Sequence, residues 1–413
     1  MRLLHTADWH LGQTLHGVPR TYEHGRFLSW LLTTIGEQAI DALLIAGDVF
    51  DSASPPPLAQ EQYFQFLAAA RRLYPRLQVV VVGGNHDSAA RLDAPAPVLQ
   101  AIGVNVIGGL FPDDPPERAL LPLRNAAGEE VALLLAVPFL RPRDLPGAAD
   151  PNAPAQQRLV DGHRALYQRL TEFAEGRRKK GQALLATGHA YLQGGMVSEL
   201  SERKIQMGNQ QALPVDVFPE NLAYVALGHL HRAQAVGGRE TVRYSGSPIP
   251  LSMTERDYPH QVVLVELDGE RVTKIEALLV PRTVELIAIP EAHLMVERVK
   301  EILRALPKEA PPGVPPEAQP LYEVRVWLEE PRPHLKAELE SAMEGVFGRL
   351  VRIDVKRPDR RAPEVPLGTG DLSSLSPVEV FKAAYARERK KVATPELVGL
   401  FEGLLDELLR GDP

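Results

Sequence analysis

The chain begins with the stretch MRLLHTADWHLG (residues 1–12), in which a short apolar run at 2–6 predicts a strand and is followed by Asp8 and His10. Runs of this kind, nearly continuous in Leu, Ile and Val, are typical of strands that are covered on both faces. Amphipathic stretches at 27–38 and 58–73 are predicted helices between the early runs. Strand and helix alternate, which predicts a layered α/β domain. Six further runs of the strand type occur at 42–46, 78–82, 131–137, 183–187, 224–227 and 262–267.

Ionisable and amide side chains follow five of these runs, four times beside glycine. They are Asp8 and His10, then Asp48, then Asn85, His86 and Asp87, then His189, and finally His229 and His231. The carboxyl ends of the strands in an open α/β sheet meet at one crevice, where ligands bind. Two of the clusters are pairs spaced two residues apart, so on extended backbone both members of a pair would face the same way. We therefore expect these side chains to converge on one site.

Carboxylates and imidazoles that face one another suit borderline divalent metals such as Mn²⁺, Fe²⁺ or Zn²⁺. Six or seven ligands exceed the need of one ion, whereas two ions about 3.5–4 Å apart that share one carboxylate would use them all. Such a pair predicts hydrolysis of a phosphoester by a water molecule attacking in line. Any single cluster could instead be a helix cap or a tight turn. Five clusters at five strand ends argue against that alternative.

The composition limits the class of protein. A chain of 413 residues suggests two to three domains. The absence of cysteine excludes a disulfide framework, thiolate zinc sites and a cysteine nucleophile, and it fits a reducing cytoplasm, the expected location. No apolar run approaches the length of a membrane span. The formal charge of −7 lacks the basic surplus of a protein that binds nucleic acid unaided.

The pattern of the chain changes after residue 280. Residues 281–356 predict a small α+β module with strands at 283–289, 322–328 and 351–355 and helices at 292–305 and 333–346. Residues 357–373, rich in Arg, Pro and Gly, are a predicted linker. Two helices are predicted in residues 374–413, with N-caps at Ser376 and Thr394. The second helix carries an apolar stripe, which either binds a partner or folds back onto its own domain. The stripe consists of Leu397, Leu400, Phe401, Leu404, Leu405 and Leu408.

A family resemblance rests on the same clusters. The motifs are Asp8-Trp9-His10, Gly47-Asp48-Val49-Phe50-Asp51, Gly84-Asn85-His86-Asp87, Gly188-His189 and Gly228-His229-Leu230-His231. Together they resemble the calcineurin-like metallophosphoesterase superfamily. The stretches 4–12, 138–144 and 244–252 narrow the resemblance to the SbcD family, over nearly the whole chain. It implies an α/β fold: a layered αββα metallophosphoesterase domain (1–280), a small α+β capping domain (281–356), a linker (357–373) and a C-terminal helical partner-binding tail (374–413).

The resemblance also implies roles for the residues in the motifs. The ligands of one metal ion in the family are similar to Asp8, His10 and His231. Those of a second ion are similar to Asn85, His189 and His229. The carboxylate that bridges the two ions is similar to Asp48. His86 resembles the catalytic histidine, which is not a ligand and stabilises charge on the phosphate or protonates the leaving oxygen. Asp87 and Asp51 are candidates for orienting these groups, with a purely structural role equally expected. The family implies manganese, although the residue types alone leave iron, magnesium and zinc open.

The implied activity is that of a metal-dependent DNA nuclease subunit in DNA repair, recombination and replication. The family implies 3′→5′ exonuclease action on duplex ends and endonuclease action on single strands and hairpins. It also implies a homodimer within a heterotetramer, in which the tail binds an SbcC-type ATPase. The chain has no phosphate-binding Gly-x-x-x-x-Gly-Lys-[Ser/Thr] run, so any ATP dependence must come from such a partner. Candidates for contacts with DNA phosphates, for which ordinary surface ion pairs are an equal alternative, are Arg20, Arg141, Arg143 and Arg232.

Two other function classes compete with this interpretation. A small-molecule phosphodiesterase or phosphatase could use the same two-metal scaffold, but it would need neither a capping module nor a helical tail. A catalytically silent scaffold for the ATPase is the other class, and the complete set of predicted ligands argues against it.

Overall fold

The computed structural model describes residues 1–147, 152–196, 212–358, 377–389 and 391–401. The chain divides into two compact units, one of residues 1–327 with 332–355 and one of residues 328–331 with 356–413. The domain limits expected from the sequence at residues 280, 356 and 373 stay a prediction.

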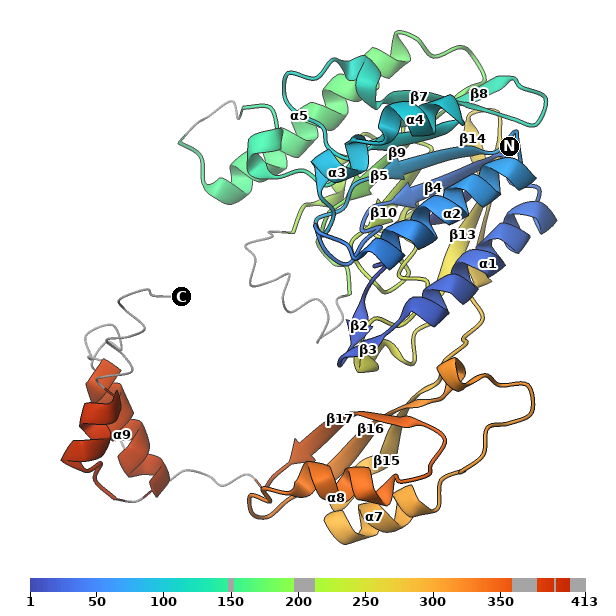
Figure 1. Cartoon of the computed structure of the whole chain (residues 1–413). Helices are drawn as coiled ribbons and strands as arrows, with labels where there is room; N and C mark the ends of the chain where they lie inside the picture. Colours follow the sequence, from blue (N-terminus) through green and yellow to red (C-terminus); the bar gives the residue numbers. More distant parts are fainter. Residues whose placement is uncertain (148–151, 197–211, 359–376, 390, 402–413) are drawn as a thin grey trace. The chain divides into compact units, whose positions relative to one another are not determined.

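Two six-stranded sheets form the centre of the first unit (Figure 1). The first sheet has the order β14-β13-β1-β4-β5-β6, with β1, β4, β5 and β6 parallel and β13 antiparallel to β1. Its strands are β1 (Arg2–Thr6), β4 (Ala42–Ala46), β5 (Gln78–Val82), β6 (Val104–Ile107), β13 (Gln261–Asp268) and β14 (Arg271–Leu279). The second sheet has the order β11-β12-β10-β9-β8-β7. Its strands are β7 (Leu120–Arg124), β8 (Glu130–Leu135), β9 (Ala183–His189), β10 (Tyr224–Gly228), β11 (Gln234–Val236) and β12 (Arg239–Tyr244).

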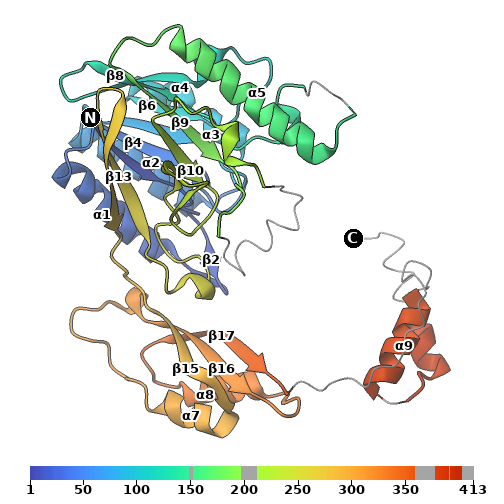
Figure 2. The same cartoon turned by 180° about the vertical axis from the view of Figure 1, so that it is seen from behind.

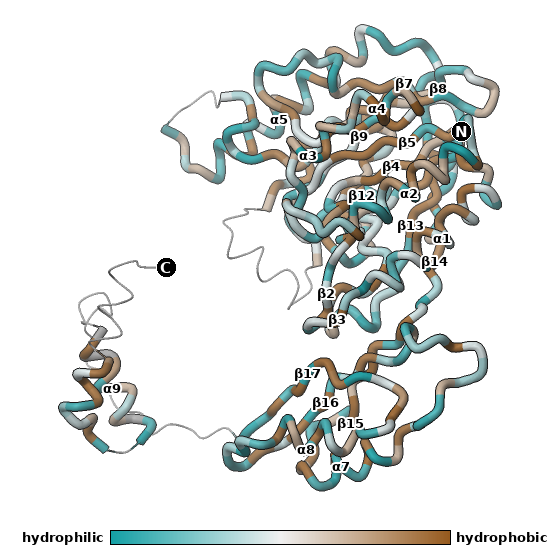
Figure 3. Tube along the Cα trace, viewed as in Figure 1, coloured by the Kyte–Doolittle hydropathy of each residue, from teal (hydrophilic) through white to brown (hydrophobic). Residues whose placement is uncertain are grey.

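Helices cover the outer face of each sheet, so the domain has four layers. Helices α1 (Thr21–Glu37) and α2 (Pro57–Leu73) pack on the first sheet, and α5 (Ala155–Glu175) packs on the second (Figures 1 and 2). In β1, Leu3 belongs to the core between the sheets and Leu4 to the core beneath α1 and α2. Strands apolar on both faces are what this packing requires, and Figure 3 shows β4, β5 and β9 as largely hydrophobic. The predicted αββα layering is confirmed. Shorter elements are β2 (Thr14–Leu15), β3 (Val18–Pro19), α3 (Ala89–Asp93) and α4 (Ala96–Ala101).

The module that follows is α+β. Strands β15 (Leu286–Met295), β16 (Leu321–Trp327) and β17 (Arg349–Lys356) form a sheet in that order, accompanied by α7 (Val296–Arg304) and α8 (Leu335–Ala342). The helix predicted over 292–305 is wrong in its first turn. Residues 292–295 continue β15, because Leu294 and Met295 pair with Val326 and Trp327 of β16.

The second unit contains α9 (Pro377–Arg389) and a helical segment at residues 395–401. The backbone N–H of Leu397 donates to Oγ1 of Thr394 at 3.4 Å, which confirms the predicted N-cap. The ring of Phe401 stacks on that of Phe381 with centroids 4.2 Å apart. Ser376 and the remaining stripe residues Leu404, Leu405 and Leu408 lie outside the described residues. Among the residues that are described, no helix has the length and apolar character needed to cross a membrane.

Candidate metal centre

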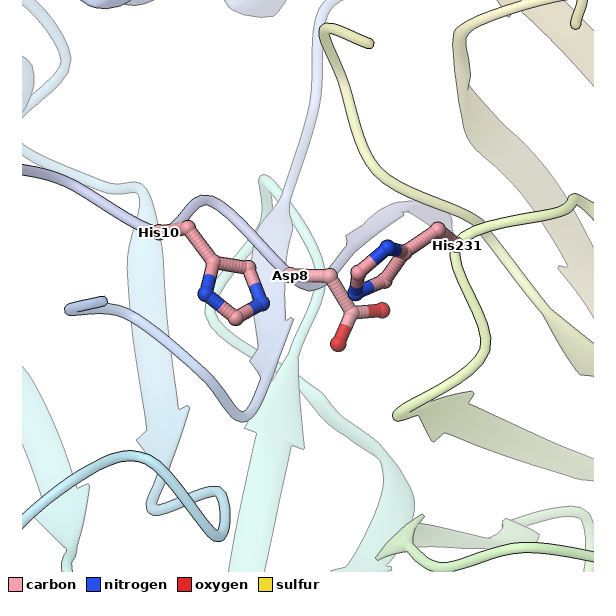
Figure 4. A group of neighbouring side chains, drawn as sticks. All are labelled: Asp8, His10 and His231. Atoms are coloured by element: carbon pink, nitrogen blue, oxygen red, sulfur yellow. The ribbon is translucent and has the colours of Figure 1, made fainter. Parts of the chain in front are cut away.

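The two sheets bring the predicted ligands together at the carboxyl ends of their strands. The loops after β1, β4 and β5 supply Asp8, His10, Asp48 and Asn85, while β9 supplies His189 and the loop after β10 supplies His229 and His231. In the part of the chain that the structure describes, three groups have donor atoms that all lie within 4.8 Å of one another. They are Asp8/His10/His231, His10/Asp48/His86 and Asp48/His189/His229. Figure 4 shows the first of them, with the Asp8 carboxylate between two imidazole rings.

The backbone reaches this arrangement through left-handed turns. The φ angles of Asp8, His10 and His229 are 55°, 48° and 108°, so the expectation of extended backbone at the spaced pairs is wrong, although the side chains do converge. A non-glycine residue in this conformation costs about 1–3 kcal/mol and persists where its surroundings fix it. The N–H of Asp8 donates to Gly47 O, and the N–H of His229 donates to Oδ1 of Asp8, each bond fixing one of these turns.

Two glycines leave the room that the ligands need. A Cβ atom on Gly84 would lie 2.1 Å from Oδ1 of Asp48, and one on Gly47 would lie 2.2 Å from Nδ1 of His189. Because Gly47 also has a φ of 94°, both space and conformation exclude a side chain there. The glycines beside the predicted ligands are therefore part of the site.

Asp48 lies between the other ligand groups. Its Oδ1 accepts the backbone N–H of His86 at 2.9 Å, and its Oδ2 lies 3.3 Å from Nε2 of His189 and 3.6 Å from Nε2 of His10. Burial acts to raise the pKa of the Asp48 carboxyl, but His189 and His10 hold that pKa well below its usual value. In return, the Asp48 charge outweighs burial and raises the pKa of His189 to about 9. The ionised Asp48 carboxylate thus lies between His10, which follows β1 of the first sheet, and His189, which ends β9 of the second sheet.

Asn85 joins the two histidines that come from the second sheet. Its Oδ1 lies 3.0 Å from Nε2 of His189 and 2.8 Å from Nδ1 of His229. An amide oxygen placed between two imidazoles, with Asp48 beside them, is a donor set that suits a divalent ion.

Three buried polar atoms of the cluster have no hydrogen-bond partner among the described residues. They are Oδ2 of Asp8, Nε2 of His10 and Nε2 of His229. Leaving such atoms unpaired in a protein interior costs free energy, so each needs an explanation. Burial raises the pKa of Asp8 to about 7 and lowers the pKa of His10 and of His229, so it disfavours the charged form of each side chain. The donor atoms therefore fit bound divalent metal ions.

His86 lies at the edge of this cluster and is only half-buried. Its Nδ1 lies 2.9 Å from the backbone oxygen of Asp51, to which it donates, so Nε2 is left for another partner. The side chain of Asp51 lies 3.2 Å from Nδ1 of His10. Burial acts to raise the pKa of Asp51, but the hydrogen bond to His10 lowers it.

The Asp87 carboxylate holds the backbone of the site through its hydrogen bonds. It accepts the backbone N–H groups of Val49, Phe50 and Gly84 at 2.9–3.1 Å. It therefore ties the loop after β4 to the loop after β5. Burial and the neighbouring Asp48 charge raise the pKa of Asp87 to about 6.

Sequence reasoning missed Glu255, which is fully buried and lies 3.0 Å from Nδ1 of His231. It ends the 3-10 turn η4 (Met253–Glu255), far along the chain from the histidine and after no apolar run. Only its nearness to the stretch 244–252, quoted above for its resemblance, could have drawn attention to it.

Arg20 is not available to bind a phosphate, and its assignment as a DNA contact is wrong. The side chain is only 1% exposed, its guanidinium forms two bonds to Glu23, and Nη1 donates to Pro250 O at 2.7 Å. Arg141, Arg143 and Arg232 are exposed and stay candidates. The guanidinium of Arg232 lies 5.5 Å from the centre of the Tyr258 ring.

Replacing Arg20 with methionine is expected to lower the free energy of unfolding by about 3–5 kcal/mol, because Glu23 is left as a buried charge without its partner. Urea unfolding would measure the loss, and the double variant Arg20→Met/Glu23→Leu is expected to recover much of it. Arg143→Ala, at an exposed position, should change stability by less than about 0.5 kcal/mol. An Arg20→Met variant of unchanged stability but weakened DNA binding would restore the original assignment.

Comparisons with known proteins identify the family. A family model described as calcineurin-like phosphoesterase matches residues 1–233, more than half of the chain. A second model, described as type 5 capsule protein repressor C-terminal domain, matches residues 282–389.

Two of the similar relatives match more than nine-tenths of the chain, and a third matches about two thirds of it. The protein named as the D component of nuclease SbcCD in Rhodobacter capsulatus is 40% identical over 391 residues, which cover 93% of this chain and 94% of the relative. The protein of that name from Escherichia coli K12 is 33% identical over 395 residues, which cover 94% of this chain and 93% of the relative. The protein of that name from Bacillus subtilis is 37% identical over 286 residues, which cover 68% of this chain and 70% of the relative. Given these similarities, the chain belongs to the calcineurin-like phosphoesterases and, among them, to the SbcD family.

Proposed function

We propose that this chain is the nuclease subunit of an SbcCD-type complex and hydrolyses DNA phosphodiester bonds with two divalent metal ions. The observation that carries the proposal is the convergence of two buried carboxylates and four buried histidines, three of whose polar atoms have no hydrogen-bond partner in the described parts of the chain. The family membership supports it, since the relatives bear the name nuclease.

The proposed ligand sets follow the geometric groups. One ion would be held by Asp8, His10 and His231. The other would be held by Asn85, His189 and His229. Asp48 would contact both ions, since it belongs to one group with His10 and to another with His189 and His229. His86 also lies within reach of Asp48 and His10, but the family resemblance assigns it to catalysis. We propose manganese as the metal. When bound, the two ions would polarise the phosphodiester and lower the pKa of an attacking water molecule.

His86 would act on the leaving group. Its Nδ1–H donates to the backbone oxygen of Asp51, which fixes the ring, and its half-exposed position leaves Nε2 free to meet substrate. A protonated Nε2 would donate to the leaving oxygen or to the charge that develops on the phosphate. The backbone N–H of His86 donates to Asp48, so the histidine is held against the proposed bridging carboxylate.

The charge of the chain bears on how DNA would be held. Two divalent ions carry four positive charges, which takes the formal charge from −7 to −3 and still leaves no strong basic field. Of the candidate arginines, the exposed side chains of Arg141, Arg143 and Arg232 would contribute locally. We propose that an SbcC-type ATPase supplies the rest of the DNA-binding surface, within a heterotetramer that contains two copies of this chain. Its place would be the cytoplasm, in DNA repair, recombination and replication.

The direct test is cleavage by the purified chain with Mn²⁺. Single-stranded and hairpin DNA should be cut internally and duplex ends degraded from the 3′ side, and EDTA should stop both reactions. Hydrolysis of bis-p-nitrophenyl phosphate without any cleavage of DNA would instead support the small-molecule phosphodiesterase. Absence of both activities in a metal-loaded, folded chain would support a silent scaffold.

The tail is the proposed binding site for the ATPase. Its described part exposes Val392 and Leu400 at 87% and 67%, apolar surface that a helix-in-groove contact would bury. Deleting residues 374–413 is therefore expected to abolish co-purification with SbcC and to leave metal-dependent cleavage of single strands intact. Association that survives the deletion would place the interface elsewhere. The variant Val392→Ser/Leu400→Ser is a milder form of the same test.

A further inference from the structure

Glu255 is a buried acidic residue whose carboxylate contacts Nδ1 of His231, a proposed metal ligand. The side chain is fully buried, and its Oε1 lies 3.0 Å from Nδ1 of His231. Its other oxygen, Oε2, accepts the backbone N–H of Leu251 at 2.8 Å. Glu255 belongs to none of the three groups of candidate ligands.

We propose that Glu255 is a positioning residue that fixes the tautomer and ring orientation of His231 for metal binding. The inference rests on the proposed two-metal function. In this arrangement the Glu255 carboxylate accepts a hydrogen bond from Nδ1–H of His231 at 3.0 Å, and Nε2 keeps its lone pair for the metal. A histidine that binds a metal commonly donates its other ring N–H to a carboxylate, which raises its basicity as a ligand.

The neighbouring ligand His10 has the same arrangement. Its Nδ1 lies 3.2 Å from the carboxylate of Asp51, and its Nε2 is one of the three buried atoms described above that lack a hydrogen-bond partner among the described residues. Both histidines of the first ligand group thus have a carboxylate at Nδ1. The two carboxylates differ in their surroundings, since the Asp51 side chain is 39% exposed and that of Glu255 is not exposed at all. Glu255 is therefore the more completely buried of the two.

The backbone around Glu255 is held from several sides. Gln13 donates to Leu251 O at 2.9 Å and Arg20 to Pro250 O at 2.7 Å, from the loop that follows β1 and from the start of α1. Ser247 N–H donates to His231 O at 3.0 Å. The segment of residues 245–255 is therefore bonded near its start to the backbone of His231 and ends at Glu255. This gives the buried Arg20–Glu23 pair a role in supporting the site.

The variant Glu255→Gln tests the proposal with little change in shape. Leu251 N–H and His231 Nδ1–H both donate to the carboxylate, whereas glutamine offers one acceptor oxygen and one donor amide. It can satisfy either Leu251 N–H or His231 Nδ1–H, but not both. If the amide faces His231, the ring proton must move to Nε2 and the ligand lone pair is lost. We expect Mn²⁺ affinity to fall about 10- to 100-fold at one of two sites and to stay unchanged at the other.

Isothermal titration of the full-length chain with Mn²⁺ measures both affinities without depending on activity. The matched control is Glu323→Gln, which alters a buried carboxylate that pairs with Arg325 and Arg352 in the α+β module and should leave both affinities unchanged. If the wild-type chain binds no Mn²⁺, the proposed function itself fails. If the wild type binds two ions and a folded Glu255→Gln variant binds both equally well, only this inference is overturned.

A second measurement needs no Glu255 variant. In the Zn²⁺-loaded wild-type chain labelled with ¹⁵N-histidine, the ring resonances of His231, assigned through a His231→Gln variant, should show a proton on Nδ1 and none on Nε2. A proton on Nε2 with metal-bound Nδ1 would overturn the proposal even if Glu255→Gln fails to fold.

Discussion

Replacing His86 with alanine is expected to slow DNA cleavage by orders of magnitude while both Mn²⁺ ions remain bound. Nδ1 of His86 is bonded to Asp51 O and its ring lies edge-on to that of His10, while its backbone N–H to Asp48 is a contact that alanine retains. A positioned general acid contributes about 10²–10⁴-fold to rate, so single-turnover cleavage should slow by that factor. Metal content is measured by mass spectrometry on the same sample.

The control for this variant is His163→Gln. The ring of His163 bonds to Leu159 O within its own helix, and the variant should cut DNA at the wild-type rate. Full activity of His86→Ala would remove His86 from the mechanism. Loss of metal from that variant would make it a ligand instead.

Asp48→Asn should have the other large effect, because it removes the charge that both ion sites share. We expect neither Mn²⁺ ion to stay bound at micromolar metal concentration and cleavage to fall by more than about 10³-fold, beyond the 10- to 100-fold typical of groups that act through a ligand. Asparagine preserves the shape, so the fold should persist. Titration calorimetry and a cleavage assay measure the two outcomes.

Asp51→Asn is the matched comparison for Asp48→Asn. It alters a carboxylate that contacts His10 but belongs to none of the groups of candidate ligands, so we expect only a 10- to 100-fold loss of Mn²⁺ affinity at one site. Equal, wild-type binding by both variants would contradict the role of Asp48 as the shared ligand.

The early strands could be predicted from sequence because burial on both faces leaves a continuous apolar signal. The bounds predicted for β1, β4 and β5 agree with the structure. Helix α1 begins six residues before the predicted start, since Thr21–Arg26 carries mostly polar side chains and shows no apolar pattern. The extension of β15 through Met295 depends on its pairing with β16, a contact that local sequence does not encode.

The sequence allowed the ligand residues of the site to be predicted, but not the backbone geometry that brings them together. Ligands that follow strands were recognisable because strand ends converge. The left-handed turns at Asp8 and His10 could not be foreseen, since they accompany hydrogen bonds that these residues donate to backbone oxygens in the loop after β4. Glu255 and Arg20 illustrate the same limit. Whether a charged side chain binds a distant backbone, a ligand or solvent is decided by packing between segments far apart in sequence.

The most direct test is anomalous diffraction from crystals of the chain soaked in Mn²⁺. We predict two manganese peaks about 3.5–4 Å apart. One should lie among Asp8, His10 and His231, the other among Asn85, His189 and His229, with Asp48 contacting both. No peak under saturating manganese, or a single ion remote from Asp48, would contradict a shared two-metal centre.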